Sequence, residues 1–266
     1  MTIVPSSGGG GPLDGLPGGV TLNRTLDKLL AVQRPVVLAH IRSIRRAKPD
    51  ATPAQVIRSL ERRYLAAVTT GGALVGATSA IPAVGTVASI ALSTAETAGF
   101  LEASALFSQS VTEVHGIAVR DPERARTLVM TMILGSAGSD LVEQLAGEVV
   151  GVAPARSAFW GELVTRNIPK SAFSGVAKRM RSFFLKKFAA SEGAGIIGRA
   201  IPFGIGAVIG GAGNHFLGRR VVASARTAFG PAPDAFPGDL EIYRPPTLTL
   251  VDSDPSQKPK ARAIPR

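Results

Sequence analysis

The chain of 266 residues contains no cysteine, and only 5% of its residues are aromatic. The absence of cysteine excludes disulfides, thiolate nucleophiles and Cys-ligated metals. The three histidines, His40, His115 and His215, are isolated in the sequence, and no HExxH motif accompanies them. We therefore expect no metal site and no cofactor, because a zinc site built without cysteine needs histidines and carboxylates at defined spacings.

The N-terminus also lacks the basic stretch and apolar run that mark a secretory signal peptide. We expect a protein that is not secreted and that lies in the cytoplasm, at the inner face of the cell membrane. Residues 1–20 are rich in Gly and Pro, and residues 231–266 are rich in Pro and mixed charge. Such segments bury too little apolar surface to fold, so both are expected to be disordered. Residues 21–230 are then one domain.

Few stretches alternate between polar and apolar residues, so the sequence predicts an all-α fold rather than a sheet. We expect a helical bundle of about six or seven helices. Clear helix starts occur at Thr52-Pro53-Ala54-Gln55 and at Asp121-Pro122-Glu123. A helix over 22–47 is expected to break at Pro35.

Two long stretches carry no Asp, Glu, Lys or Arg: residues 64–95, divided by Pro82, and residues 200–218. Each arm of the first stretch is near the ~20 residues that a membrane-spanning helix needs. Ala, Gly, Ser, Thr and Val dominate these stretches, however, and give a marginal tendency to insert. The two interpretations are helices that contact lipid and helices buried in a soluble core.

The two uncharged stretches belong to segments that resemble each other. Arg58-Ser59, Ala66-Ala67, Gly76 and Ala80-Ile81-Pro82 recur as Arg181-Ser182, Ala189-Ala190, Gly198 and Ala200-Ile201-Pro202. The alternative is chance matching in Ala/Gly-rich sequence. Small residues and prolines in both copies predict close helix packing; these are Gly72, Gly76, Pro82, Gly85, Pro202, Gly206 and Gly210.

A genuine duplication predicts that the two copies pack together about a pseudo-twofold axis. Glu96 and Asn214 fall near equivalent positions in the two copies. We therefore expect these two side chains to meet as a buried polar contact.

The net charge of +11 is unevenly distributed. Residues 24–63 and 156–187 are strongly basic, whereas residues 96–148 are acidic. Basic segments beside apolar ones suit an anionic membrane surface, where each Lys or Arg contributes about 1 kcal/mol. We expect no nucleic-acid partner, because the chain has neither a nucleic-acid-binding module nor interleaved aromatics.

The residues 171–190 combine phenylalanines with cations on an amphipathic helix. This pattern is typical of a helix lying at a membrane interface. The equal alternative is a surface helix whose phenylalanines face the protein core. The expected contacts to the membrane surface, or to another anionic group, are Lys178, Arg179, Arg181, Lys186 and Lys187.

No motif points to catalysis. Gly193-Ala-Gly195-Ile-Ile-Gly198 matches GxGxxG, but a basic helix precedes it and no acid follows before Asp234, so it lacks the setting of a dinucleotide site. We predict no catalytic residue and no enzyme activity.

Several short motifs resemble those of the bacterial EcsC family. They are Gly72-Ala73-Leu74-Val75-Gly76, Ile81-Pro82-Ala83-Val84-Gly85, His115-Gly116, Asp121-Pro122-Glu123-Arg124, Leu134-Gly135-Ser136-Ala137-Gly138, Ile201-Pro202-Phe203-Gly204-Ile205-Gly206-Ala207-Val208-Ile209-Gly210, Asn214 and Phe229-Gly230. The resemblance covers residues 53–230. It implies a helical, membrane-associated protein without established catalytic residues.

These features predict a non-enzymatic helical protein associated with the cytoplasmic membrane face. A protein partner or a homo-oligomer is also compatible with them. The alternative is a soluble bundle that binds a lipid, another apolar ligand or a protein partner. A hydrolase acting at the membrane ranks third.

Overall fold

The computed structural model describes residues 27–30, 32–78, 86–150, 159–198 and 205–240. Along the chain these form α2 (Arg34–Ala47), α3 (Pro53–Thr78), α4 (Thr86–Val114), α5 (Pro122–Leu134), α6 (Ser136–Val150), α7 (Trp160–Glu162), a π-helical turn (Leu163–Asn167), α8 (Lys170–Gly198), α9 (Ile205–Phe229) and a 3-10 turn (Gly238–Leu240). Seven of these helices have 13 or more residues, and no described residue lies in a strand. The predicted all-α bundle is confirmed.

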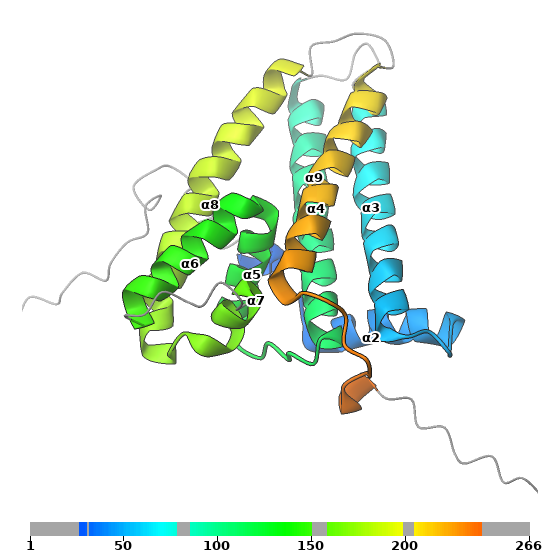
Figure 1. The fold of residues 1–266 in the computed structure, drawn as a ribbon. Helices are drawn as coiled ribbons and strands as arrows, with labels where there is room; N and C mark the ends of the chain where they lie inside the picture. Colours follow the sequence, from blue (N-terminus) through cyan, green and yellow to red (C-terminus); the bar gives the residue numbers. More distant parts are fainter. Residues whose placement is uncertain (1–26, 31, 79–85, 151–158, 199–204, 241–266) are drawn as a thin grey trace, which may run out of the picture.

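Helices α3, α4 and α9 stand side by side, with α2 across their base (Figure 1). Helix α3 packs on both α4 and α9, whereas α8 packs on α5 and α6. The upper ends of α3, α4, α8 and α9 rise beyond the upper ends of α5 and α6 (Figure 1). The described molecule therefore has a broad lower part and a narrower upper part made of long helices.

Local sequence signals account for the helix boundaries. At the start of α3, Thr52 N donates to Gln55 Oε1 at 2.9 Å and Gln55 N donates to Thr52 Oγ1 at 3.4 Å, which is a reciprocal capping box. At the start of α5, the Asp121 carboxylate accepts from two backbone N–H groups. Helix α2 begins with Pro35 in its first turn, so the predicted break at this proline is confirmed.

Gly135 separates α5 from α6. Its φ of +66° lies in the left-handed region, where glycine carries no steric cost. A Cβ at Gly138, one turn further on, would lie 2.5 Å from the Thr131 carbonyl oxygen. The two helices can turn back on each other because both positions are glycine.

The few aromatic residues are concentrated in the lower core. Tyr64 of α3 stacks on Phe107 of α4 with ring centroids 4.7 Å apart, and Phe173 and Phe184 of α8 are buried. Arg45 of α2 lies over the Phe236 ring, 3.9 Å from its centroid. These large side chains thus fill the core of the broad part of the molecule.

The first part of the expected disordered tail is ordered. Residues 231–240 are described, and Leu240 is buried in the core. The expectation of disorder from residue 231 was wrong for this segment, because Phe236 and Leu240 supply apolar surface that the core covers. The expectations for residues 1–20 and 241–266 fall outside the described residues.

The two similar segments have different neighbours. The first forms α3 and α4, which pack on each other, while the second forms α8, which packs on α5 and α6, and α9, which packs on α3. The described contacts therefore do not follow the pseudo-twofold that a symmetric duplication predicts. The reason is that the apolar face of α8, with Phe173, Met180 and Phe184, is already covered by the lower core.

Candidate functional site

Polar side chains connect α3, α4 and α9 about halfway along these helices, and we call this set of contacts the polar seam. Asn214 of α9 donates to Glu96 Oε1 of α4 at 3.0 Å and to the Val68 carbonyl of α3 at 3.3 Å. The Thr69 hydroxyl of α3 lies 3.0 Å from His215 Nδ1. Asn214 and Glu96 are half-buried, so the contact expected from the sequence is present but is partly open to solvent.

The upper parts of α3, α4 and α9 are uncharged. We call this region the prong and define it as residues 64–78 of α3, 86–95 of α4 and 205–218 of α9; none of these residues is Asp, Glu, Lys or Arg. Its described surface exposes three large apolar side chains: Leu74 (64%), Phe216 (64%) and Leu217 (44%). Phe216 and Leu217 are adjacent on α9 and form a continuous apolar surface, the kind of feature that marks a contact with lipid or with another molecule.

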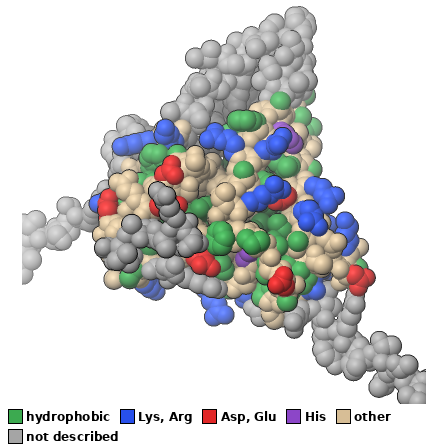
Figure 2. Space-filling view, viewed as in Figure 1, with side chains coloured by type: hydrophobic (Ala, Val, Ile, Leu, Met, Phe, Trp, Pro, Cys, Tyr) green, Lys and Arg blue, Asp and Glu red, His purple; other side chains and the backbone are tan. Residues whose placement is uncertain are grey.

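Exposed arginines lie directly below the prong. Arg62 and Arg63 precede its α3 part, and Arg219 and Arg220 follow its α9 part. Gly218 packs against Tyr64 and Leu65, so the two arginine pairs lie at a similar height. We call these four residues the arginine band. Figure 2 shows Lys and Arg side chains distributed across the middle of the visible face.

The basic segment of α8 is divided between surface and core. Lys178, Arg179, Lys186 and Lys187 are exposed. Phe173, Met180 and Phe184 of the same helix are buried, so these side chains contact the protein core and are not free to enter a membrane. Phe173 and Phe184 fit the interpretation as a surface helix packed on the core, while Phe183 is half-buried.

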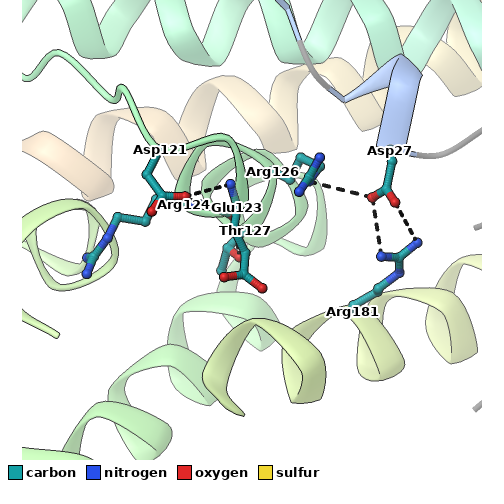
Figure 3. A network of polar contacts seen from close by, with 7 residues as sticks. All are labelled: Asp27, Asp121, Glu123, Arg124, Arg126, Thr127 and Arg181. Atoms are coloured by element: carbon teal, nitrogen blue, oxygen red, sulfur yellow. Dashed lines mark hydrogen bonds and ion pairs between the residues drawn. The ribbon is translucent and has the colours of Figure 1, made fainter. Parts of the chain in front are cut away.

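Arg181 and Arg179 are held by carboxylates. Arg181 forms two contacts with Asp27, at 3.2 and 3.3 Å, and Arg126 of α5 approaches the same carboxylate at 3.6 Å (Figure 3). Arg179 pairs with Glu148 of α6. These two arginines are therefore weaker candidates for an anionic surface than Lys178, Lys186 and Lys187, near which no described carboxylate forms an ion pair.

The structure describes the surroundings of only two of the expected helix-packing residues. Gly72 is buried and Gly76 half-buried in α3. Gly206 and Gly210 lie in α9, but their surroundings, like Pro82, Gly85 and Pro202, fall outside the described residues.

The described close approach of α9 to α3 uses two other glycines. A Cβ at Gly211 would lie 3.3 Å from Ala73 Cβ, and one at Gly218 would lie 3.0 Å from Val68 Cγ2. The sequence signal for them is a spacing of seven residues, which keeps the two glycines on one helix face.

Burial affects two histidines outside the prong. Burial lowers the pKa of His115, whose ring stacks on Phe229 with centroids 5.2 Å apart. Burial, and to a lesser extent the charge of Arg63, lowers the pKa of His40.

No three of the described His, Asp or Glu side chains gather as a metal site. Within the described residues, no helix has both the length and the apolar character needed to cross a membrane.

Comparisons of the chain with protein-family models, with curated proteins and with solved structures find no match. The resemblance to the EcsC family therefore stays a prediction.

Proposed function

We propose that the protein binds the surface of an anionic membrane and inserts the prong into one leaflet. The observation that carries this proposal is the order of features along α3 and α9. The uncharged end of α3 exposes Leu74 and that of α9 exposes Phe216 and Leu217, and on each helix two exposed arginines border the uncharged part.

The dimensions suit one leaflet. The α3 part of the prong has 15 residues, from Tyr64 to Thr78, and at 1.5 Å per residue it is about 22 Å long. Half of the hydrocarbon core of a bilayer is about 15 Å thick. The prong is thus long enough to pass the headgroups and enter one leaflet without crossing the membrane.

Two contributions favour this position. Leu74, Phe216 and Leu217 would move from water into acyl chains, which favours insertion by on the order of 1–2 kcal/mol per side chain. Arg62, Arg219 and Arg220 would lie among anionic headgroups, at about 1 kcal/mol per arginine, whereas Arg63 donates to Ser43 of α2. The long apolar stems of arginine allow the guanidinium groups to stay at the polar boundary. Both free-energy contributions, from apolar insertion and from the arginines, are moderate, so membrane binding is expected to be reversible.

The polar seam supports this role. Asn214 links α3, α4 and α9 where the prong begins, so the three helices would enter the membrane as one group. Glu96 is the first charge on α4 below the prong. Its partner Asn214 lies five residues from Arg219 within the uncharged part of α9, so the amide holds the Glu96 carboxylate more than one helical turn above the arginine band.

Co-sedimentation with vesicles tests the proposal. The protein should bind vesicles of phosphatidylcholine and phosphatidylglycerol more strongly than vesicles of phosphatidylcholine alone. Double substitution Arg219→Gln/Arg220→Gln should weaken binding at least tenfold and reduce its dependence on salt. Phe216→Ser/Leu217→Ser should weaken binding at both high and low salt.

Arg42→Gln/Arg46→Gln is the matched control, because both arginines are exposed on α2 at the base. This control should lose much less binding than the band variant. Equal losses in the two arginine pairs would indicate a general charge effect and contradict the proposed orientation. Recovery of the native protein wholly in the soluble fraction of cells would contradict membrane binding altogether and favour the soluble bundle.

A further inference from the structure

A cleft of about 390 Å³ lies between α2, α4 and α5, at the opposite end of α4 from the prong. Its apolar wall is formed by Val32, Val119, Pro122 and Ala125. Its polar lining comes mainly from α4, through Gln109, Thr112 and Glu113, which lie three and four residues apart and thus share one face of the helix. The volume is at the lower end of the range for small-molecule sites.

Glu113 is neutralised within the cleft. Arg34 Nε donates to Glu113 Oε1 at 2.7 Å, and Arg34 Nη2 donates to Oε2 at 3.0 Å. The Glu113 side chain is only 7% exposed. A buried carboxylate held by two charge-assisted hydrogen bonds is a fixed part of the wall, so it does not supply a free charge for a ligand.

One buried amide in the lining lacks a hydrogen-bond partner, and one exposed cation at the rim forms no ion pair with a described carboxylate. Gln109 is 8% exposed, and its Nε2 amide has no hydrogen-bond partner among the described residues. Arg120, at the rim, is exposed and forms no ion pair with a described carboxylate. A buried amide N–H calls for an acceptor oxygen, and a guanidinium favours an anionic one.

We propose that this cleft binds a small monocarboxylate with a short apolar chain. One carboxylate oxygen faces the Arg120 guanidinium, the buried Gln109 amide turns about its terminal bond to donate Nε2–H to the other oxygen, and the chain lies against Val119 and Ala125. The formal charge of the lining is +1 from Arg34, Arg120 and Glu113, which matches one carboxylate. This site is separate from the prong and does not depend on membrane binding.

Isothermal titration of the full chain with hexanoate tests the site. Hexanoate should bind saturably at one site per chain, and hexanamide, which has the same length but no charge, should bind at least tenfold more weakly. Arg120→Gln and Gln109→Leu should each weaken hexanoate binding at least tenfold. Arg42→Gln and Arg219→Gln/Arg220→Gln, which change exposed arginines elsewhere, should leave it unchanged.

Thermal unfolding separates a ligand role of Gln109 from a structural one. Gln109→Leu removes a buried amide that lacks a partner, so its midpoint of unfolding should equal or exceed that of the native chain. A lower midpoint together with full hexanoate binding would overturn the proposal. Equal affinities for hexanoate and hexanamide, or no binding of hexanoate at millimolar concentration, would also overturn it.

Discussion

Asn214 of α9 donates one hydrogen bond to Glu96 of α4 at 3.0 Å and another to the Val68 carbonyl of α3 at 3.3 Å. A single amide therefore connects α3, α4 and α9. It lies where the charged lower parts of these helices meet the uncharged prong. The sequence predicted the meeting of Glu96 and Asn214, while the backbone acceptor on α3 was not foreseen.

Asn214→Ala should lower the free energy of unfolding by about 1–2 kcal/mol, because two hydrogen bonds in a half-buried setting are lost. Asn214→Asp should cost more, since it places a second carboxylate beside Glu96. Urea unfolding measures both values. Gln144→Ala, at an exposed position on α6, should change stability by about 0.5 kcal/mol or less. An Asn214→Ala value as small as that of the control would show that the seam does not hold the helices together.

The packing of α9 on α3 through glycine gives a second prediction. Gly213 has open space where a Cβ would be, whereas a Cβ at Gly218 would lie 3.0 Å from Val68 and 3.1 Å from Leu65. Both glycines lie within α9, so alanine improves helix propensity by about 1 kcal/mol at each. Gly213→Ala should therefore raise the melting temperature, and Gly218→Ala should raise it less or lower it. Equal increases at both positions would show that the close approach to α3 is unimportant.

Stability should fall as the pH decreases from 7.5 to 5.5. Burial lowers the pKa of His115 in the folded chain, so the unfolded chain takes up the proton first as the pH passes through its own value near 6.5. The stability associated with the neutral ring is complete above that value and is lost as the pH falls toward the lower folded-state pKa.

His115→Phe keeps an aromatic ring against Phe229 but cannot titrate. Thermal unfolding of this variant should show a shallower decline between pH 7.5 and 5.5 than the native chain. Part of the decline should persist, because burial also lowers the pKa of His40. Identical pH dependence in the two proteins would contradict this role of His115.

Features set by neighbouring residues were predictable from the sequence. The start of α3 at Thr52, the start of α5 at Asp121 and the break at Pro35 all depend on side chains and backbone groups within one helical turn. The all-α fold follows from the same local rules. These predictions are confirmed because tertiary contacts do not have to be known to make them.

Contacts between distant segments were not predictable in the same way. Arg34 and Glu113 are 79 residues apart, and Asp27 and Arg181 are 154 apart. Nothing in a single sequence selects these partners from the other charged residues. The expected packing of the two similar segments on each other is found between α3 and α9, but nothing in the sequence showed that α8 would pack on α5 and α6.

The amphipathic part of α8 shows a further limit. Its spacing of phenylalanines and cations fits both a membrane-surface helix and a helix packed on a core. Only the positions of α5 and α6 show that Phe173 and Phe184 face protein. This shifts the candidate lipid contact from the phenylalanines of α8 to Leu74, Phe216 and Leu217.

The absence of cysteine allows one direct test of insertion. Phe216→Cys carries a single thiol that can be labelled with the polarity-sensitive fluorophore NBD. The control is Gln144→Cys, at an exposed position on α6, outside the prong. With vesicles containing phosphatidylglycerol, emission from the label at 216 should increase and shift to shorter wavelength, while emission from the label at 144 should stay unchanged. Vesicle binding without any change at 216 would contradict insertion of the prong.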